Sequence, residues 1–200
     1  IGARYAQQYV GKFGFPPERT PAQLTTALGA GSTTPWEMAG AYSVFANGGY
    51  RVKPYLIDRV TDNEGKVLMK VHNPQAGDET IRAIDERNAF IMHTLLNGVI
   101  RGGTGARAYR ELKRVDMGGK TGTTDDARDR YFVGFSPYYC AAVWCGYKSN
   151  EVVYAGGNPC AALWRDVMSQ IHEGWEDVGF HRGAGLKHVT VCADSGPLAT

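Results

Sequence analysis

The chain has 200 residues, 43% of them hydrophobic, and a formal net charge of +2. This length suits one ordinary domain with a sizeable core. Basic and acidic residues are interspersed, so nothing indicates nucleic-acid binding, and no apolar stretch is long enough to span a bilayer.

The first half of the sequence predicts two helices. Apolar residues recur at helical spacing over 5–13, and Gly14 follows where a helix would end. Thr34, Pro35 and Glu37 form the pattern of a capping box with proline at the first helical position. A second amphipathic helix is therefore expected from residue 35.

A hairpin and a third helix are expected next. Segments 52–61 and 66–71 have strand composition and are separated by turn residues at 63–65. Asp85 is placed to cap a helix before two glycines end it. The residues expected on the apolar face of this helix are Ile91, Leu95 and Val99.

Three strands and a last helix complete the pattern. Segments 119–124, 131–135 and 138–147 are spaced as an antiparallel meander, with Ser136 and Pro137 making the tight connection. The final helix carries its apolar side chains on one face: Leu163, Trp164, Val167, Met168 and Ile171. This order of elements indicates an α+β fold, an antiparallel sheet flanked by helices.

Neither the cysteines nor the histidines are spaced as metal ligands. Cys140 and Cys145 are five residues apart in a strand, so their side chains are expected on opposite faces. Buried small hydrophobic residues are the simplest interpretation of all four cysteines: Cys140, Cys145, Cys160 and Cys192. One disulfide is compatible with an oxidising compartment, but spacing does not assign its partners.

The segment most informative about chemistry is Lys120-Thr121-Gly122-Thr123-Thr124. A phosphate-binding loop would need glycine five positions before Gly119, where Arg114 stands, and it would have to open a helix. An ordinary edge strand with a solvated lysine is a second interpretation. The third is the K-T-G element of serine acyl transferases.

The residue types fit the needs of such an acyl transferase. An edge strand can hold an acyl peptide by backbone pairing, and Lys120 supplies a cation for the substrate carboxylate and the nucleophile. Thr121 and Thr123 are two apart, so their hydroxyls share a face. Gly122 allows close approach of a ligand, and a backbone N–H would stabilise the oxyanion.

Several further segments, in the same order as in the family, resemble class A penicillin-binding proteins. These are 33–49, 118–124, 129–137, where Tyr131 replaces a more common tryptophan, and 191–196, which resembles Gram-positive versions. The resemblance implies a transpeptidase domain in which Lys120, Thr121, Gly122, Thr123 and Thr124 bind substrate. It also implies that the Thr123 N–H is the second oxyanion donor.

For the parent protein, the resemblance implies a D,D-transpeptidase that cross-links peptidoglycan through a serine acyl-enzyme. Its partners would be stem peptides ending in D-Ala-D-Ala, and β-lactams that mimic them. No cofactor, metal or nucleic acid is implied. Its location would be the extracytoplasmic face of the bacterial cell membrane, with the anchor outside this chain.

One departure from the family pattern concerns the nucleophile. None of the six serines has lysine three positions later or asparagine two positions later, so S-x-x-K and S-x-N are absent. We therefore expect residues 1–200 to be the C-terminal portion of one transpeptidase domain. The N-terminal part of that domain would carry the nucleophile and act as a partner, and the isolated chain would be inactive.

Two other classes of parent protein fit the same residues. One is a non-catalytic homologue that senses peptidoglycan or β-lactams, and the other is a β-lactamase or D,D-carboxypeptidase. The presence of S-x-x-K in the rest of the parent would argue against the sensor. Transfer to an acceptor amine, as opposed to simple hydrolysis, would argue against the hydrolase.

Overall fold

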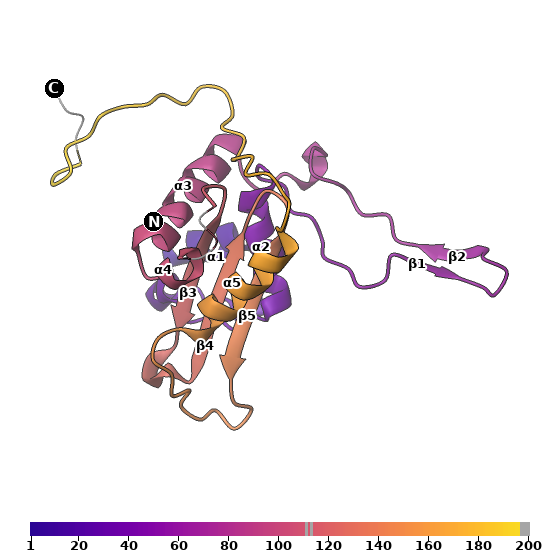
Figure 1. Ribbon diagram of the computed structural model, residues 1–200, viewed down its shortest axis with the longest axis horizontal. Coiled ribbons are helices and arrows are strands. Elements are labelled where there is room, and N and C mark those ends of the chain that lie inside the picture. The colour runs from indigo at the N-terminus through magenta and orange to yellow at the C-terminus, as the bar shows by residue number, and fades with distance from the viewer. Residues whose placement is uncertain (111, 113, 197–200) are drawn as a thin grey trace.

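The computed structural model describes residues 1–110, 112 and 114–196, and its centre is a three-stranded antiparallel sheet (Figure 1). The strands are β3 (Gly118–Thr123), β4 (Asp129–Phe135) and β5 (Cys140–Gly146), in the order β3-β4-β5. The α+β class and the predicted meander are confirmed, with strand ends shifted by one or two residues.

Helices cover both faces of this sheet. On one face, α2 (Pro35–Ala46) places Tyr42 and Phe45 against Phe135 of β4. On the other face lies α5 (Pro159–Ile171), next to the short α4 (Ala106–Tyr109). The long helix α3 (Glu86–Gly102) packs along β3. The sheet is thus the middle of three layers, and β4 is its most deeply buried strand.

The remaining elements surround these layers. Helix α1 (Ala3–Gly11) lies against the α2 layer, where Tyr9 packs on the cluster around Val44. Three short 3₁₀ segments precede α2 or α3: Pro17–Arg19, Leu24–Leu28 and Glu79–Ile81. The predicted hairpin is present as β1 (Arg59–Thr61) and β2 (Val67–Lys70), and it projects from the body of the molecule (Figure 1). Every residue of both strands is exposed.

The hairpin strands are shorter than predicted, because 52–58 is not a strand. This segment has no neighbouring strand for its backbone, and two-stranded hairpins without a packed face are marginal in water. The turn itself is well specified. The Asp62 carboxylate accepts the backbone N–H groups of Glu64 and Lys66, at 3.0 and 2.9 Å, and Gly65 adopts φ +82°.

The capping box at the start of α2 is confirmed. The Thr34 hydroxyl accepts the Glu37 N–H at 3.2 Å, and the Glu37 carboxylate accepts the Thr34 N–H at 3.0 Å. Asp85 likewise caps α3 by accepting the Arg87 N–H. Both helix starts were therefore predictable from side chains within three residues of the cap.

The predicted apolar face of α3 is wrong. Ile91 and Leu95 are 46% and 60% exposed, whereas the buried stripe consists of Ala89, His93, Leu96 and Ile100. The helix carries two apolar stripes at helical spacing, and packing against β3 selects the second. In α5, Trp164 and Met168 are buried as expected, but the neighbouring stripe of Leu163, Val167 and Ile171 is exposed.

The main core lies between α5 and β4. Trp164 and Phe132 are buried, with ring centroids 5.0 Å apart. Gly134 leaves the space that the indole fills, because a Cβ there would lie 2.6 Å from Trp164 Cζ2. The glycine is thus required by packing on this face of the sheet and not by its backbone conformation.

A buried ion pair holds the C-terminal segment against the residues before β3. Asp116 is completely buried, and Arg114 binds its two oxygens at 2.9 and 2.7 Å. The same guanidinium donates to the carbonyls of Trp175 and Glu176. Because both charges are paired and hydrogen-bonded, their burial is compatible with stability.

A buried serine–histidine pair locks the turn between β4 and β5. His172 Nδ1 lies 2.8 Å from the Met168 carbonyl and must donate to it, so Nε2 accepts the Ser136 hydroxyl at 2.7 Å. The Ser136 oxygen also accepts the Tyr138 and Tyr139 N–H groups. Burial lowers the pKa of His172, and the imidazole is therefore neutral.

Gly134→Ala should destabilise the protein by about 1–3 kcal/mol, because the buried Trp164 and Phe132 rings cannot move aside for the new methyl group. Gly98→Ala is the matched control, since this exposed helical position has open space and alanine favours the helix. Urea unfolding measures both variants. Equal midpoints for the two would contradict the packing role of Gly134.

The free energy of unfolding should decrease as the pH drops below about 6.5, which is the pKa of histidine in the unfolded chain. Burial lowers the pKa of His93 to about 4, against a smaller opposing effect of Asp116. Between these two pKa values, His93 binds a proton in the unfolded chain but not in the native protein. The free energy of unfolding therefore decreases by up to about 1.4 kcal/mol for each pH unit.

His93→Phe should make this pH dependence shallower, since neither ring nitrogen has a hydrogen-bond partner among the described residues and the ring stacks on Phe180 at 3.7 Å. His72→Gln, at an exposed position, serves as control. Urea midpoints between pH 7 and 4.5 are the measurement. If the urea midpoint of His93→Phe changes with pH as steeply as that of the unchanged protein, His93 is not the source of the pH dependence.

Candidate active site on strand β3

Strand β3 is an edge strand whose burial changes along its length. It pairs with β4 on one side, and no other described strand pairs with it. Gly118 and Gly119 are buried, whereas Lys120 and Thr123 are exposed and the two residues between them are half-buried. The second half of the strand, which contains K-T-G, is therefore accessible along its free edge.

The two glycines before Lys120 are structural requirements that the sequence did not reveal. A Cβ on Gly119 would lie 2.7 Å from Phe132 Cζ, and one on Gly118 would lie 3.0 Å from Phe135 Cζ. Larger residues at these positions would push β3 away from β4 or from the aromatic core. The glycines thus fix where Lys120 emerges from the helical layers.

The strand places its side chains on two faces. Lys120 pairs with Val133 and Gly122 pairs with Tyr131, on the α2 side of the sheet, whereas Thr121 and Thr123 point to the α5 side. The shared face of the two threonines agrees with the prediction. Lys120 approaches the same free edge from the opposite face, and its ammonium donates to the Thr121 carbonyl at 2.8 Å.

Two side-chain contacts at the site were not predicted from the sequence. The Thr121 hydroxyl lies 2.9 Å from the Thr104 hydroxyl, which comes from the segment between α3 and α4. Tyr131 stands beside Gly122 and donates its hydroxyl to the Thr33 carbonyl at 3.3 Å. Burial raises the pKa of Tyr131, so the phenol stays protonated. Neither contact has a local signal in the sequence.

Thr124 lies one residue beyond β3 and is engaged in the turn. Its hydroxyl accepts the Asp129 N–H at 2.8 Å, and its own N–H donates to the Asp129 carbonyl at 3.1 Å. Thr124 therefore closes the β3–β4 connection. Four of the five predicted site residues remain along the accessible edge.

The β3–β4 turn is held from outside by the 147–157 loop. Asp126 and Ala127 have φ of 59° and 54°, a left-handed conformation that costs energy for residues other than glycine. The Ala127 carbonyl accepts the Val153 N–H at 3.0 Å, and Arg128 donates to the Asn150 carbonyl at 2.6 Å. These contacts keep the end of the K-T-G strand in place.

Ser136 is completely buried and its hydroxyl is committed to His172, so it has no access to a substrate. No group of three or more histidine, cysteine, aspartate or glutamate side chains among the described residues could hold a metal ion.

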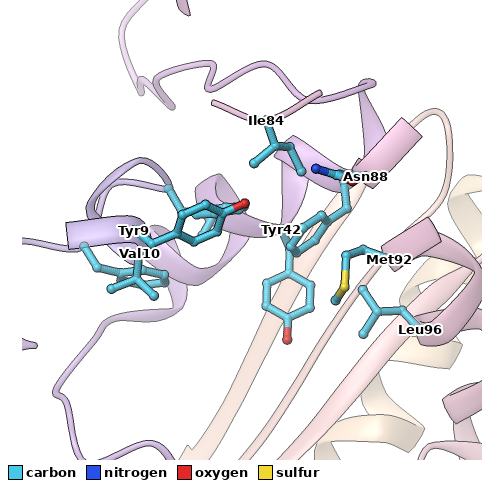
Figure 2. A pocket seen from close by; sticks show the side chains of 11 residues that line it. Tyr9, Val10, Tyr42, Ile84, Asn88, Met92 and Leu96 are labelled. Carbon is cyan, nitrogen blue, oxygen red and sulfur yellow. The ribbon is translucent and has the colours of Figure 1, made fainter. Parts of the chain in front are cut away.

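An apolar cavity of about 370 Å³ lies between α1, α2 and α3. Figure 2 shows Tyr9, Tyr42, Met92 and Leu96 around it, with Asn88 at its rim. Its walls are mostly hydrocarbon and aromatic, and K-T-G does not line it. The cavity is therefore separate from the K-T-G strand.

The sequence matches the family described as "Penicillin binding protein transpeptidase domain" over residues 1–169. Penicillin-binding protein 1A of Neisseria gonorrhoeae is 44% identical over 189 residues, which are 93% of this chain and 24% of that protein. The chain thus spans about a quarter of the length of this curated relative.

Two solved structures have the same fold. Penicillin-binding protein 1A from Haemophilus influenzae matches with a TM-score of 0.89 at 27% identity, over 99% of this chain and 35% of that one. PonA1 from Mycobacterium tuberculosis, in complex with penicillin V, matches with a TM-score of 0.70 at 22% identity, over 88% of this chain and 50% of that one. At that identity, the second match concerns the fold alone.

The segment 191–196, on which the Gram-positive resemblance rests, lies beyond the family match, so the Gram-positive type stays a prediction. Among the residues that the structure describes, no helix is both long and apolar enough to cross a membrane. The family match covers the helical layers, the sheet and the K-T-G strand together. The chain belongs to the penicillin-binding protein transpeptidase domain family.

Proposed function

We propose that this chain is the substrate-binding part of a serine D,D-transpeptidase that cross-links peptidoglycan stem peptides. The observation that carries the proposal is the exposed Lys120 at the accessible half of an edge strand, next to a glycine. A peptide ending in D-Ala-D-Ala could add to this edge by backbone pairing. The family membership supports the reaction class.

Each residue of the strand has a proposed role. Lys120 provides the positive charge for the substrate carboxylate and for the nucleophile. Thr121 and Thr123 offer hydroxyls from the opposite face, with Thr104 orienting that of Thr121. Gly122 presents no side chain to an approaching ligand, and the Thr123 N–H stabilises the oxyanion. Thr124 contributes through the turn that ends the strand.

The proposed reaction has two acyl-transfer steps. A serine outside these 200 residues attacks the carbonyl of the penultimate D-alanine, and the terminal D-alanine leaves. An amine of a second stem peptide then takes the acyl group from the serine. A β-lactam would enter the same place and leave a stable acyl-enzyme. In support of β-lactam binding, the structurally similar PonA1 was solved in complex with penicillin V.

The rest of the same domain is proposed to supply the nucleophile. Two observations support this: S-x-x-K and S-x-N are absent from the 200 residues, and the relatives are about four times as long as the matched region. The apolar cavity between α1, α2 and α3 is a surface that this part could cover (Figure 2). We place the parent protein at the extracytoplasmic face of the bacterial membrane.

Lys120→Ala in the full-length protein should slow acylation by a fluorescent penicillin about 10²–10³-fold, the usual effect of losing one key electrostatic contact to a developing charge. The fold should be unaffected, because the Lys120 side chain is exposed. Lys66→Ala, at the exposed turn of the hairpin, is the matched control. An unchanged acylation rate in Lys120→Ala would overturn the proposed role of β3.

The isolated 200-residue chain should not be labelled covalently by fluorescent penicillin, whereas the full-length protein should be. A denaturing gel and intact mass of both samples provide the measurement. Label on the isolated chain would mean that one of its own serines can act as nucleophile, and the proposed division of the domain would be wrong.

A further inference from the structure

Two of the four cysteines lie next to each other between the sheet and α5. Cys145 of β5 is the ladder partner of Arg130, and the Cys160 thiol donates to the Arg130 carbonyl at 3.0 Å. Antiparallel partners carry their side chains on the same face, and this face of Arg130 is the one that α5 covers. Cys160 belongs to the core cluster around Trp164, and Cys145 packs against this cluster.

The pKa of the Cys160 thiol also reflects its closeness to Cys145. Its pKa is raised to about 11, first by burial and then by the neighbouring Cys145 thiol, which is also within hydrogen-bonding reach. Cys160 is only 1% exposed, whereas Cys145 is half-buried. Cys145 is therefore the less deeply buried residue of the pair.

The other two cysteines lie elsewhere. Cys140 is on the opposite face of β5, as the sequence predicted, and its thiol donates to the Ala39 carbonyl of α2 at 3.2 Å. Cys192 is exposed in the C-terminal segment, so the expectation that all four cysteines are buried is wrong for this residue. Cys145 and Cys160 are thus the two cysteines that share one face of the sheet.

We infer that Cys145 and Cys160 form a disulfide when the protein meets a low-molecular-weight or protein disulfide as oxidant. The Cys145 thiolate attacks the oxidant disulfide and expels one thiolate, which leaves a mixed disulfide on Cys145. The Cys160 thiolate then attacks the Cys145 sulfur and expels the second thiolate. Two cysteine thiols are oxidised, and one disulfide is reduced to two thiols.

The bond would close a loop that supports the candidate active site. The 147–157 loop lies between the two cysteines and holds the β3–β4 turn through Val153 and Asn150. Arg130 also donates to the Val153 and Gly157 carbonyls. A disulfide across the base of this loop limits its freedom in the unfolded chain, and extracytoplasmic compartments favour such bonds.

Peptide mapping of the full-length protein tests the bond without requiring activity, so its result is separate from that of the penicillin assays. The protein is incubated with oxidised glutathione or with dithiothreitol, denatured in N-ethylmaleimide and digested with trypsin and chymotrypsin. Cleavage after Lys148 separates the two cysteines, and cleavage after Trp144 separates Cys145 from Cys140.

The expected result is a linked pair of peptides containing Cys145 and Cys160 that disappears on reduction. Maleimide labelling of both residues should fall at least tenfold, because excess oxidant shifts the two-electron equilibrium between thiols and disulfide toward the disulfide. Full labelling of both cysteines after oxidation would overturn the inference. So would a linkage of Cys160 to any other cysteine.

Thermal unfolding with matched variants provides a second test. Oxidation should raise the apparent Tm of the domain by about 6–12 °C, the shift expected for closing a loop of this size. Cys192→Ser should keep this rise and Cys145→Ser, a nearly isosteric change at a half-buried position, should abolish it. The same rise in Cys145→Ser would assign the effect to another disulfide.

Discussion

The contact between Trp164 of α5 and the central strand β4 is the interaction on which the rest of the structure depends. The indole lies over Gly134 and against the Phe132 ring, and both aromatic side chains are buried. Since interiors are close-packed, this contact fixes the distance and rotation of α5 relative to the sheet. Strands β3 and β5 then take their positions from the ladders that they form with β4.

The position of the candidate site depends on how much of strand β3 the helices cover. Gly118 and Gly119 allow close packing on the first half of the strand, and cover ends at Lys120. The far end is held by the turn between Thr124 and Asp129, which the 147–157 loop supports. The accessible edge is thus fixed at both ends, which is what a strand that pairs with an extended peptide requires.

Several buried polar groups near α5 have partners within the protein. Asp116 is paired with Arg114, and Ser136 is paired with a neutral His172, so burial leaves these polar groups with partners. The exceptions among the described residues are the two ring nitrogens of His93 and the indole N–H of Trp164, which are buried without a partner. Because burial lowers the pKa of His93, this imidazole links the stability of the layers to acid.

Features that depend on near neighbours along the chain were predictable from the sequence. The capping box of Thr34 and Glu37 and the opposite faces of Cys140 and Cys145 each follow from spacings of three to five residues. Contacts across the fold set the buried apolar stripe of α3, the point where helical cover of β3 ends and the position of Cys160 beside Cys145. These are contacts between residues far apart in sequence, and local spacing cannot encode them, because burial is set by the partner surface that each helix or strand meets.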